Sequence, residues 1–197
     1  ALAGVENGLV LVLGTGIGGG IILNGKVYMG AHSAAGEVSN FVTDMAAMEP
    51  DSFTLKKIER LPEMPVWAGN SSATGLIFEY AKEKEMDLDG PMPTGEEIFA
   101  AYNAGEPEAQ HTLKVFARRV AIGVLSLQSI LDVEKVAIGG GISAAEALLP
   151  AIRTELDGIF ARCPVLPMLE PELVRCRYGN DANMIGALKL FFEQNPA

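Results

Sequence analysis

One segment of the chain, VLVLGTGIGGGIILNGK at residues 10–26, constrains the fold most, because it holds five glycines within seven residues. It contains the G-x-G-x-x-G spacing of a dinucleotide-binding turn, in which a helix must follow the glycines and receive the pyrophosphate at its N-terminus. Here the apolar run Ile21–Leu23 follows instead, and then Asn24-Gly25, a dipeptide typical of a two-residue hairpin. The segment therefore predicts a glycine-rich turn between two antiparallel strands and excludes a dinucleotide-binding turn.

A turn of this composition suits the binding of a phosphate. Glycines carry no Cβ, so backbone N–H groups can approach an anion closely, and Thr15 adds a hydroxyl donor. A tight hairpin that binds nothing is the alternative, but it needs fewer glycines than these. The candidate phosphate-binding residues are Gly14, Thr15, Gly16, Gly18 and Gly19.

A second glycine cluster, IGGGIS at residues 138–143, follows an apolar strand and opens a helix that we expect Ser143 to cap. A glycine loop before a helix N-terminus can receive a nucleotide phosphate, and a generic strand-to-helix turn explains the cluster equally well. The two clusters could hold two ends of one nucleotide.

Hydrophobic periodicity predicts an α/β fold with a three-stranded antiparallel meander followed by helices and two strand–helix units. The expected strands are residues 9–13, 18–23, 26–29, 133–138 and 173–178. The expected helices are residues 51–60, 70–84, a short one that a capping box at 94–97 begins, 106–131, 143–160 and 181–193.

Charge and composition exclude several classes of partner. The net charge is −10, and the one compact basic pair, Arg118-Arg119, lies in an apolar helix pattern, so nucleic acid is not expected as a partner. No apolar run reaches the roughly 18 residues of a membrane span, and no signal peptide is visible, so a cytoplasmic protein is expected. Cys163 and Cys176 form no metal-binding pattern, and we expect two reduced, buried thiols, with a disulfide as the minor alternative.

Three segments together resemble one known family. Residues 14–40, GTGIGGGIILNGKVYMGAHSAAGEVSN, are similar to the phosphate- and sugar-binding stretch of the ROK family of sugar kinases and sugar-responsive repressors. IGGGIS resembles the family's adenosine-side motif, and YGNDANMIGAL at residues 178–188 resembles its closing strand-to-helix segment. The resemblance implies an actin-like ATPase fold, in which two ribonuclease-H-like domains close over ATP and a sugar. Residues 1–197 would then be the C-terminal ATP- and sugar-binding domain, a fragment of such a kinase.

The resemblance also implies roles for individual residues. Thr15 and Gly16 would contact the ATP phosphates, and Gly140 and Gly141 the adenosine. Glu37 would accept hydrogen bonds from sugar hydroxyls, a task that suits a carboxylate, although a solvated loop glutamate remains the alternative.

Three departures from the family pattern change these expectations. The family's zinc-binding histidine is Asn40 here, which can still hydrogen-bond a sugar, and residues 42–67 contain no cysteine, so no zinc is expected. A second sugar-contacting glutamate of the family is replaced by Ala68, as in the family's zinc-less branch. The catalytic aspartate that should precede Gly14 has no counterpart, so no catalytic residue is assigned and the chain alone is expected to be inactive. The sequence N-D-A-N at residues 180–183 instead suits a helix start, with Asp181 as a cap.

These observations predict a glucokinase-like function, the ATP- and Mg-dependent phosphorylation of a hexose or amino-hexose. The alternative is the sugar-sensing domain of a ROK-type transcriptional repressor, and an actin-like ATPase module for a non-sugar substrate is a third possibility. A homodimer is compatible with the family, and the sequence does not identify the sugar.

Overall fold

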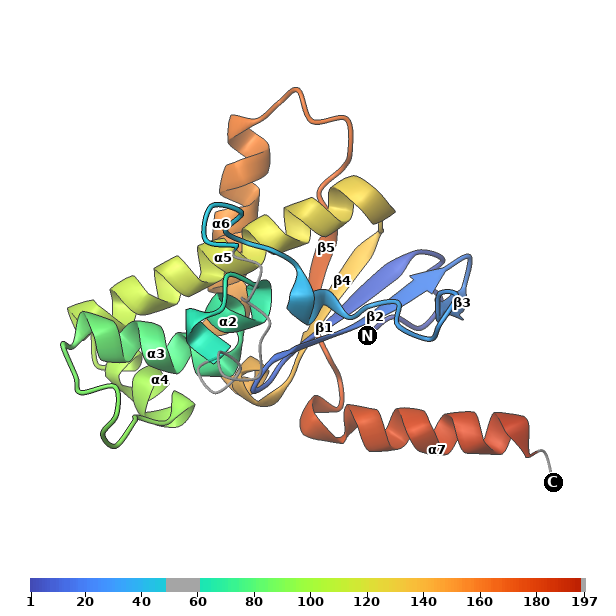
Figure 1. Cartoon of the computed structure of the whole chain (residues 1–197). Helices are drawn as coiled ribbons and strands as arrows, with labels where there is room; N and C mark the ends of the chain where they lie inside the picture. Colours follow the sequence, from blue (N-terminus) through green and yellow to red (C-terminus); the bar gives the residue numbers. More distant parts are fainter. Residues whose placement is uncertain (49–60, 196–197) are drawn as a thin grey trace.

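The computed structural model describes residues 1–48 and 61–195 (Figure 1). A five-stranded sheet with the order β3-β2-β1-β4-β5 forms its centre. β1 (Gly8–Leu13), β2 (Ile17–Leu23) and β3 (Lys26–Tyr28) form an antiparallel meander, and β4 (Lys135–Gly139) and β5 (Glu172–Arg175) continue the sheet parallel to β1. The predicted α/β fold class and the predicted meander are therefore confirmed.

The β2–β3 hairpin forms where the sequence predicts it. Asn24 and Gly25 adopt φ values of 52° and 72°, the left-handed conformations that a two-residue hairpin of this kind requires. The Gly25 N–H also donates to the Glu6 carbonyl oxygen at 2.8 Å, which attaches the hairpin to the segment before β1.

Six α-helices and four short 3-10 turns are present in the described ranges. The α-helices are α2 (Trp67–Ser71), α3 (Ala73–Glu83), α4 (Gly95–Asn103), α5 (Pro107–Leu131), α6 (Leu148–Arg162) and α7 (Ala182–Gln194). The 3-10 turns are η1 (Val38–Asn40), η2 (Leu61–Glu63), η3 (Gly141–Ala144) and η4 (Gly179–Asp181). The helix expected at residues 51–60 lies outside the described residues.

The single helix predicted at residues 70–84 is wrong, because two helices, α2 and α3, occupy this region. Ser72 lies between them in an extended conformation and caps α3, its hydroxyl oxygen accepting a hydrogen bond from the Gly75 N–H at 3.1 Å. A side chain on Gly75 would come within 2.7 Å of the Asn70 carbonyl carbon, so the glycine permits this close approach. The break follows from this local packing, which periodicity does not reveal.

The predicted start of the helix after β4 is also wrong, because α6 begins at Leu148 and not at Ser143. The Ser143 hydroxyl donates to the Gly140 carbonyl oxygen at 2.7 Å inside η3 and caps no helix. Gly140 has a φ of 93°, and the chain forms the separate turn η3 immediately after it. The last strand is shorter than predicted and ends at Arg175.

The two cysteines are free, as predicted, but their predicted burial is wrong in part. Cys163 is exposed just after the end of α6. Cys176, directly after β5, is half-buried, and burial raises the pKa of its thiol.

One face of the sheet carries the core. Leu9, Leu11 and Leu13 of β1 are fully buried there, in one cluster with Phe116 and Val120 of the long helix α5. α5 and α6 cross this face in Figure 1, and α2, α3 and α4 lie beside α5. Alternation along β1 therefore directs every second side chain toward the helices.

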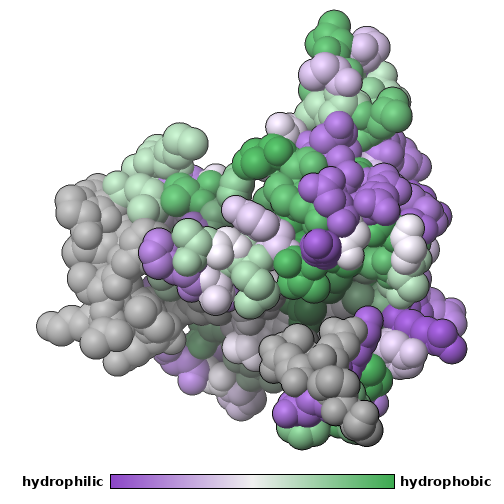
Figure 2. Space-filling view, turned by 90° about the vertical axis from the view of Figure 1, so that its right-hand side faces the viewer, coloured by the Kyte–Doolittle hydropathy of each residue, from purple (hydrophilic) through white to green (hydrophobic). Residues whose placement is uncertain are grey.

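The opposite face of the sheet is less covered. Val10 and Val12 of β1 point to it and are only partly buried. α7 lies on this side, apart from the main body in Figure 1, and its apolar side chains are largely exposed. Figure 2 views the molecule from the side on which β3 lies and shows apolar surface over the middle of this side. Val27 of β3 is 68% exposed.

Candidate functional site

The glycine turn lies at the end of β1. Gly14, Thr15 and Gly16 connect β1 to β2, and the Gly14 N–H donates to the Gly16 carbonyl oxygen at 3.0 Å. The Gly14 carbonyl oxygen accepts a hydrogen bond of 2.8 Å from the Ala73 N–H in the first turn of α3. The turn is thus attached to a helix N-terminus while the Thr15 side chain remains exposed at its tip.

The second glycine cluster lies beside the first, although the two are far apart in the sequence. β4 pairs with β1 in parallel, and Val12 opposes Gly139 at the ends of the two strands. A Cβ on Gly140 would come within 2.6 Å of the Leu13 carbonyl carbon, so this glycine lets the two strand ends meet. The structure therefore places both clusters at the carboxyl ends of neighbouring parallel strands, where α/β proteins commonly bind ligands.

A cavity of about 840 Å³ opens next to these strand ends, within the usual size range of small-molecule sites. Gly14, Thr15 and Gly141, all predicted from the sequence, line it. Its remaining wall is α4 together with η3 and the start of α3, through Leu13, Ala73, Thr94, Gly95, Glu96, Phe99, Ala100, Asn103, Ile142, Ala144 and Ala145.

α4 was not predicted from the sequence to be part of this site. The predicted capping box is present: the Thr94 hydroxyl accepts from the Glu97 N–H at 3.2 Å, and the Thr94 N–H donates to Glu97 Oε2 at 2.7 Å. The pKa of Glu97 is lowered mainly by the hydrogen bond from the Thr94 N–H and further by the Thr94 hydroxyl, which also donates to Glu97 Oε2, at 3.0 Å. The cap indicates that a helix begins here, but it gives no information on which neighbour that helix faces.

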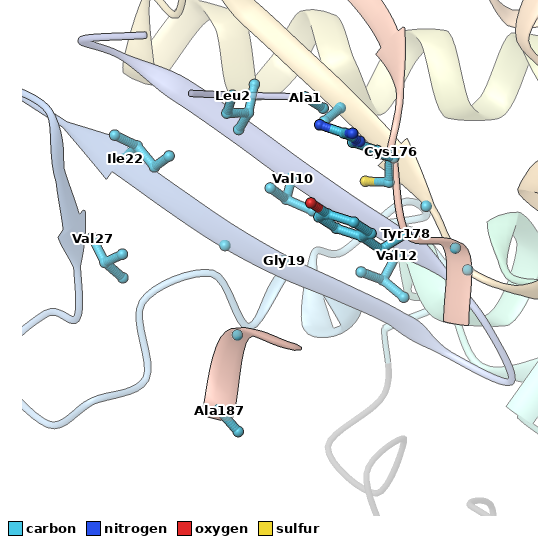
Figure 3. Close-up of a pocket in the computed structure, with 17 residues that line it drawn as sticks. Ala1, Leu2, Val10, Val12, Gly19, Ile22, Val27, Cys176, Tyr178 and Ala187 are labelled. Carbon is cyan, nitrogen blue, oxygen red and sulfur yellow. The ribbon is translucent and has the colours of Figure 1, made fainter. Parts of the chain in front are cut away.

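The other predicted ATP-binding glycines lie elsewhere. Gly19 and Gly140 line a second cavity of about 560 Å³ on the less covered face of the sheet (Figure 3). This second cavity is mostly apolar, and Figure 3 shows Tyr178 lying across it between Val10 and Val12. Gly16 and Gly18 are not among the residues that line either cavity.

The predicted sugar-binding residues lie on a loop that packs against β2. Glu37 precedes η1 and Asn40 ends it, both side chains are exposed, and both line a shallow hollow of about 370 Å³ beside the end of α5. The Ser39 hydroxyl donates to the Ile17 carbonyl oxygen at 2.5 Å and accepts from the Ile17 N–H at 3.3 Å. The loop is thus attached to the first residue of β2, directly after the glycine turn.

Aromatic and backbone contacts, which were not predictable from the sequence, attach the chain that follows Asn40 to the core. The backbone N–H of Trp67 donates to the Phe41 carbonyl oxygen at 2.7 Å. The Trp67 and Phe41 rings meet edge to face, with their centroids 6.4 Å apart. The Trp67 indole is fully buried against Gly123 of α5. Ala68 is itself buried.

Asp181 occupies the N-cap position of α7, as predicted, although its side chain makes no capping hydrogen bond. Among residues 1–48 and 61–195, no three histidine, cysteine, aspartate or glutamate side chains lie close enough together to hold a metal ion, and the expected absence of zinc stays a prediction. None of the described helices is both long enough and apolar enough to cross a membrane.

Comparison with known proteins identifies the family. The ROK family model matches residues 1–194, so the chain belongs to the ROK family. N-acetyl-D-glucosamine kinase of Pasteurella multocida is 28% identical over 191 residues, which are 94% of this chain and 59% of that protein. β-Glucoside kinase of Klebsiella pneumoniae is 30% identical over 96% of this chain and 57% of its own length. The chain thus spans little more than half the length of the curated relatives it matches.

Solved structures show the same fold. A ROK family glucokinase from Streptomyces griseus, in complex with glucose and AMPPNP, superposes with a TM-score of 0.77 at 24% identity over 96% of this chain and 62% of that one. A ROK family transcriptional regulator, a homologue of the Escherichia coli MLC protein, gives a TM-score of 0.69 at 21% identity over 93% of this chain and 45% of that one. The predicted actin-like ATPase fold is confirmed.

Proposed function

We propose that this chain is the C-terminal ATP- and sugar-binding domain of a two-domain kinase that phosphorylates a hexose or amino-hexose. The observation that carries the proposal is the meeting of two glycine clusters at the ends of β1 and β4, beside a cavity of about 840 Å³. The kinase names of the curated relatives and the ATP analogue in a structural neighbour support it.

The phosphate end of the nucleotide would lie at the turn between β1 and β2. Thr15 supplies an exposed hydroxyl at the tip, and the glycines on either side carry no Cβ that would keep an anion away from the turn. Mg²⁺ would arrive with the ATP and neutralise charge on the transferred phosphoryl group, and no ligand for it is assigned on this chain.

The sugar would bind against the loop of η1. The Glu37 carboxylate can accept two or more hydroxyl hydrogen bonds, and the Asn40 amide can both donate and accept. Ser39 and Gly36 attach this loop to Ile17 and Gly19 of β2, so the sugar-binding loop and the phosphate-binding turn are both connected to the same strand. A shared strand would fix the distance between the sugar hydroxyl and the phosphoryl group, as in-line transfer requires.

The less covered face of the sheet fits a two-domain organisation. Four apolar side chains on α7 are more than half exposed: Met184, Leu188, Phe191 and Phe192. The apolar cavity of about 560 Å³ is lined by residues of β1 and β2 and by Gly186 and Ala187 of α7. Exposed apolar surface of this extent marks an interaction site. We assign it to the contact with the other domain of the kinase, which would also supply the catalytic base, in the cytoplasm where ATP and sugars meet.

The sugar-sensing domain of a ROK-type repressor is the second candidate, favoured by the fold shared with a ROK transcriptional regulator. A sensor would bind sugar through the same Glu37 and Asn40 but would not need Thr15 to bind ATP. Nucleotide binding therefore separates the two candidates.

Isothermal titration of the chain with Mg-ATP, and separately with glucose and N-acetylglucosamine, tests the proposal. We expect Mg-ATP to bind, and Glu37→Gln to weaken sugar binding while the exposed control Glu146→Gln leaves it unchanged. Sugar binding without any nucleotide binding would favour the sensor, and no binding of either ligand would contradict both candidates. ADP release by the chain alone in the presence of sugar would contradict the assignment of the base to another domain.

A further inference from the structure

Asn40, one of the two proposed sugar-binding residues, lies between two residues that are attached to other elements. Its own side chain is exposed. On one side, the Ser39 hydroxyl bonds to both backbone groups of Ile17 in β2. On the other side, the Phe41 carbonyl oxygen accepts a hydrogen bond of 2.7 Å from the backbone N–H of Trp67 in α2. The position of the Asn40 amide therefore depends on how firmly Ser39 and Phe41 are held.

The attachment to α2 continues along the chain after Phe41. Val42 pairs with Val66 in a single antiparallel bridge. The Thr43 hydroxyl accepts a hydrogen bond of 2.9 Å from the Asn70 side-chain amide. Backbone and side-chain bonds thus join this segment to α2 and to the residue before it.

The Trp67 ring fixes α2 to the core by packing. The indole is fully buried, lies against Gly123 of α5 and meets the Phe41 ring edge to face, with centroids 6.4 Å apart. A buried indole N–H usually has a hydrogen-bond partner, but Trp67 Nε1 has none in the part of the chain that the structure describes. The shape of the ring, which contacts α5 and Phe41 together, therefore holds it in place.

The corner between α2 and α3 also contacts the phosphate-binding turn. The Ala73 N–H, at the start of α3, donates to the Gly14 carbonyl oxygen at 2.8 Å. One corner of the chain thus contacts the residue after Asn40 and the residue before Thr15. Transfer of a phosphoryl group needs its two reactants in a fixed relative position, and this corner connects the two proposed binding segments.

We propose that Trp67 is a positioning residue for sugar binding, which holds the Asn40 amide in place through the Phe41 ring. The inference rests on the proposed function, in which the sugar binds at Glu37 and Asn40. Because the indole is buried, it acts through Phe41 and does not touch the sugar. Loss of either ring would let the chain at Asn40 shift, while Ala73 would still hold the phosphate-binding turn.

Calorimetry of ring variants tests this role. Affinities for Mg-ATP and for the tighter-binding of glucose and N-acetylglucosamine are measured well below the unfolding temperature. Trp67→Phe introduces a ring too small to contact both α5 and Phe41, and Phe41→Leu removes the partner ring. Phe160→Leu in α6 is the matched control, because Phe41 and Phe160 are both partly buried and pack against the same core.

The same variants are also made in an Asn40→Ala background. This background separates positioning from direct contact, because Phe41 lines the same hollow of about 370 Å³ as Asn40. If the rings act through Asn40, removing its amide should remove their effect on the sugar.

We expect Trp67→Phe and Phe41→Leu each to weaken sugar binding roughly tenfold, the effect of about one lost hydrogen bond. Both should keep wild-type affinity for Mg-ATP, and Phe160→Leu should keep wild-type affinity for both ligands. In the Asn40→Ala background, neither ring variant should weaken sugar binding further. Partial unfolding would instead reduce the number of binding sites for both ligands and would not produce this pattern.

Three results would overturn the inference. If both ring variants bind sugar as tightly as the wild-type chain, the rings do not position Asn40, and the proposed kinase function is unaffected. If Phe41→Leu weakens sugar binding equally in the Asn40→Ala background, the ring does not act through Asn40. If the wild-type chain binds neither sugar, the proposed sugar site fails and the inference fails with it.

Discussion

The backbone of Gly36, in the loop before η1, lies directly on the backbone of Gly19 in β2. A Cβ on Gly36 would come within 2.7 Å of the Gly19 carbonyl oxygen, and a Cβ on Gly19 would collide with the Gly36 carbonyl oxygen in turn. Gly36 also has a φ of 91°, which disfavours other residues. Gly19 was predicted to bind phosphate. It has a second reason to be glycine, because the proposed sugar-binding loop packs directly against its backbone.

Replacing Gly19 should therefore disturb the fold as well as any ligand site. We expect Gly19→Ala to lower the free energy of unfolding by about 1–3 kcal/mol, the usual cost of overpacking. Gly20→Ala is the matched control, because its Cβ would meet only Val10 Cβ at an ordinary 3.9 Å. Urea unfolding followed by circular dichroism measures both, and equal midpoints for the two variants would contradict the packing argument.

Ser39 should contribute to stability through its two hydrogen bonds to Ile17. Ser39→Ala leaves the Ile17 N–H and carbonyl oxygen without these partners, and we expect a loss of about 1–2 kcal/mol. Ser129→Ala removes a hydroxyl that bonds only within an exposed part of α5 and should change stability by much less. Thermal unfolding of the two variants gives the comparison, and a larger effect of Ser129→Ala would refute the role of Ser39.

The contact between Trp67 and Gly123 predicts opposite signs for two glycine-to-alanine changes in helices. A methyl group on Gly123 would collide with the buried Trp67 indole, so we expect Gly123→Ala to destabilise by about 2 kcal/mol or more. A methyl group on Gly158 in α6 would meet only the end of the Arg162 side chain. Because alanine has a higher helix propensity than glycine, we expect Gly158→Ala to raise the free energy of unfolding by about 0.5–1 kcal/mol. Denaturant midpoints that move in the same direction for both variants would argue against the contact.

The capping box of α4 predicts a dependence of stability on pH. The pKa of Glu97 is lowered by its hydrogen bonds to Thr94, so the folded state favours the ionised carboxylate. The stabilisation from Glu97 is therefore present above its ordinary pKa of about 4.5 and is lost as the pH falls through the folded pKa.

Thr94→Ala tests this capping box directly. The variant removes the hydroxyl but keeps the backbone N–H, so the pKa of Glu97 should rise only part of the way, and stability near pH 7 should fall by about 1 kcal/mol. NMR titration of the Glu97 carboxyl and thermal unfolding measure the two effects, with Thr154→Ala, at an exposed position of α6, as the control. An unchanged Glu97 titration in Thr94→Ala would contradict the assignment.

Local sequence signals predicted the elements whose causes are local. The meander follows from three short apolar runs and the left-handed Asn24-Gly25 turn, and the start of α4 from the Thr94 cap. The break at Ser72 and the late start of α6 were not predictable in this way. Both depend on glycines that lie close to other backbone, Gly75 to Asn70 in the preceding helix and Gly140 to Leu13 in β1, and periodicity does not report such contacts.

The sequence by itself determined that a glycine-rich turn, rather than a helix, follows β1, because Ile21–Leu23 and the Asn-Gly hairpin exclude a helix there. It also determined the family, through motifs that occur in order along the chain. Only the tertiary structure decided what surrounds that turn. Parallel pairing of β1 with β4 brings the second glycine cluster beside it, and packing of Gly95 against Ile142 adds α4 as a wall. Contacts between segments far apart in sequence arise from packing of whole elements, which a local pattern does not encode.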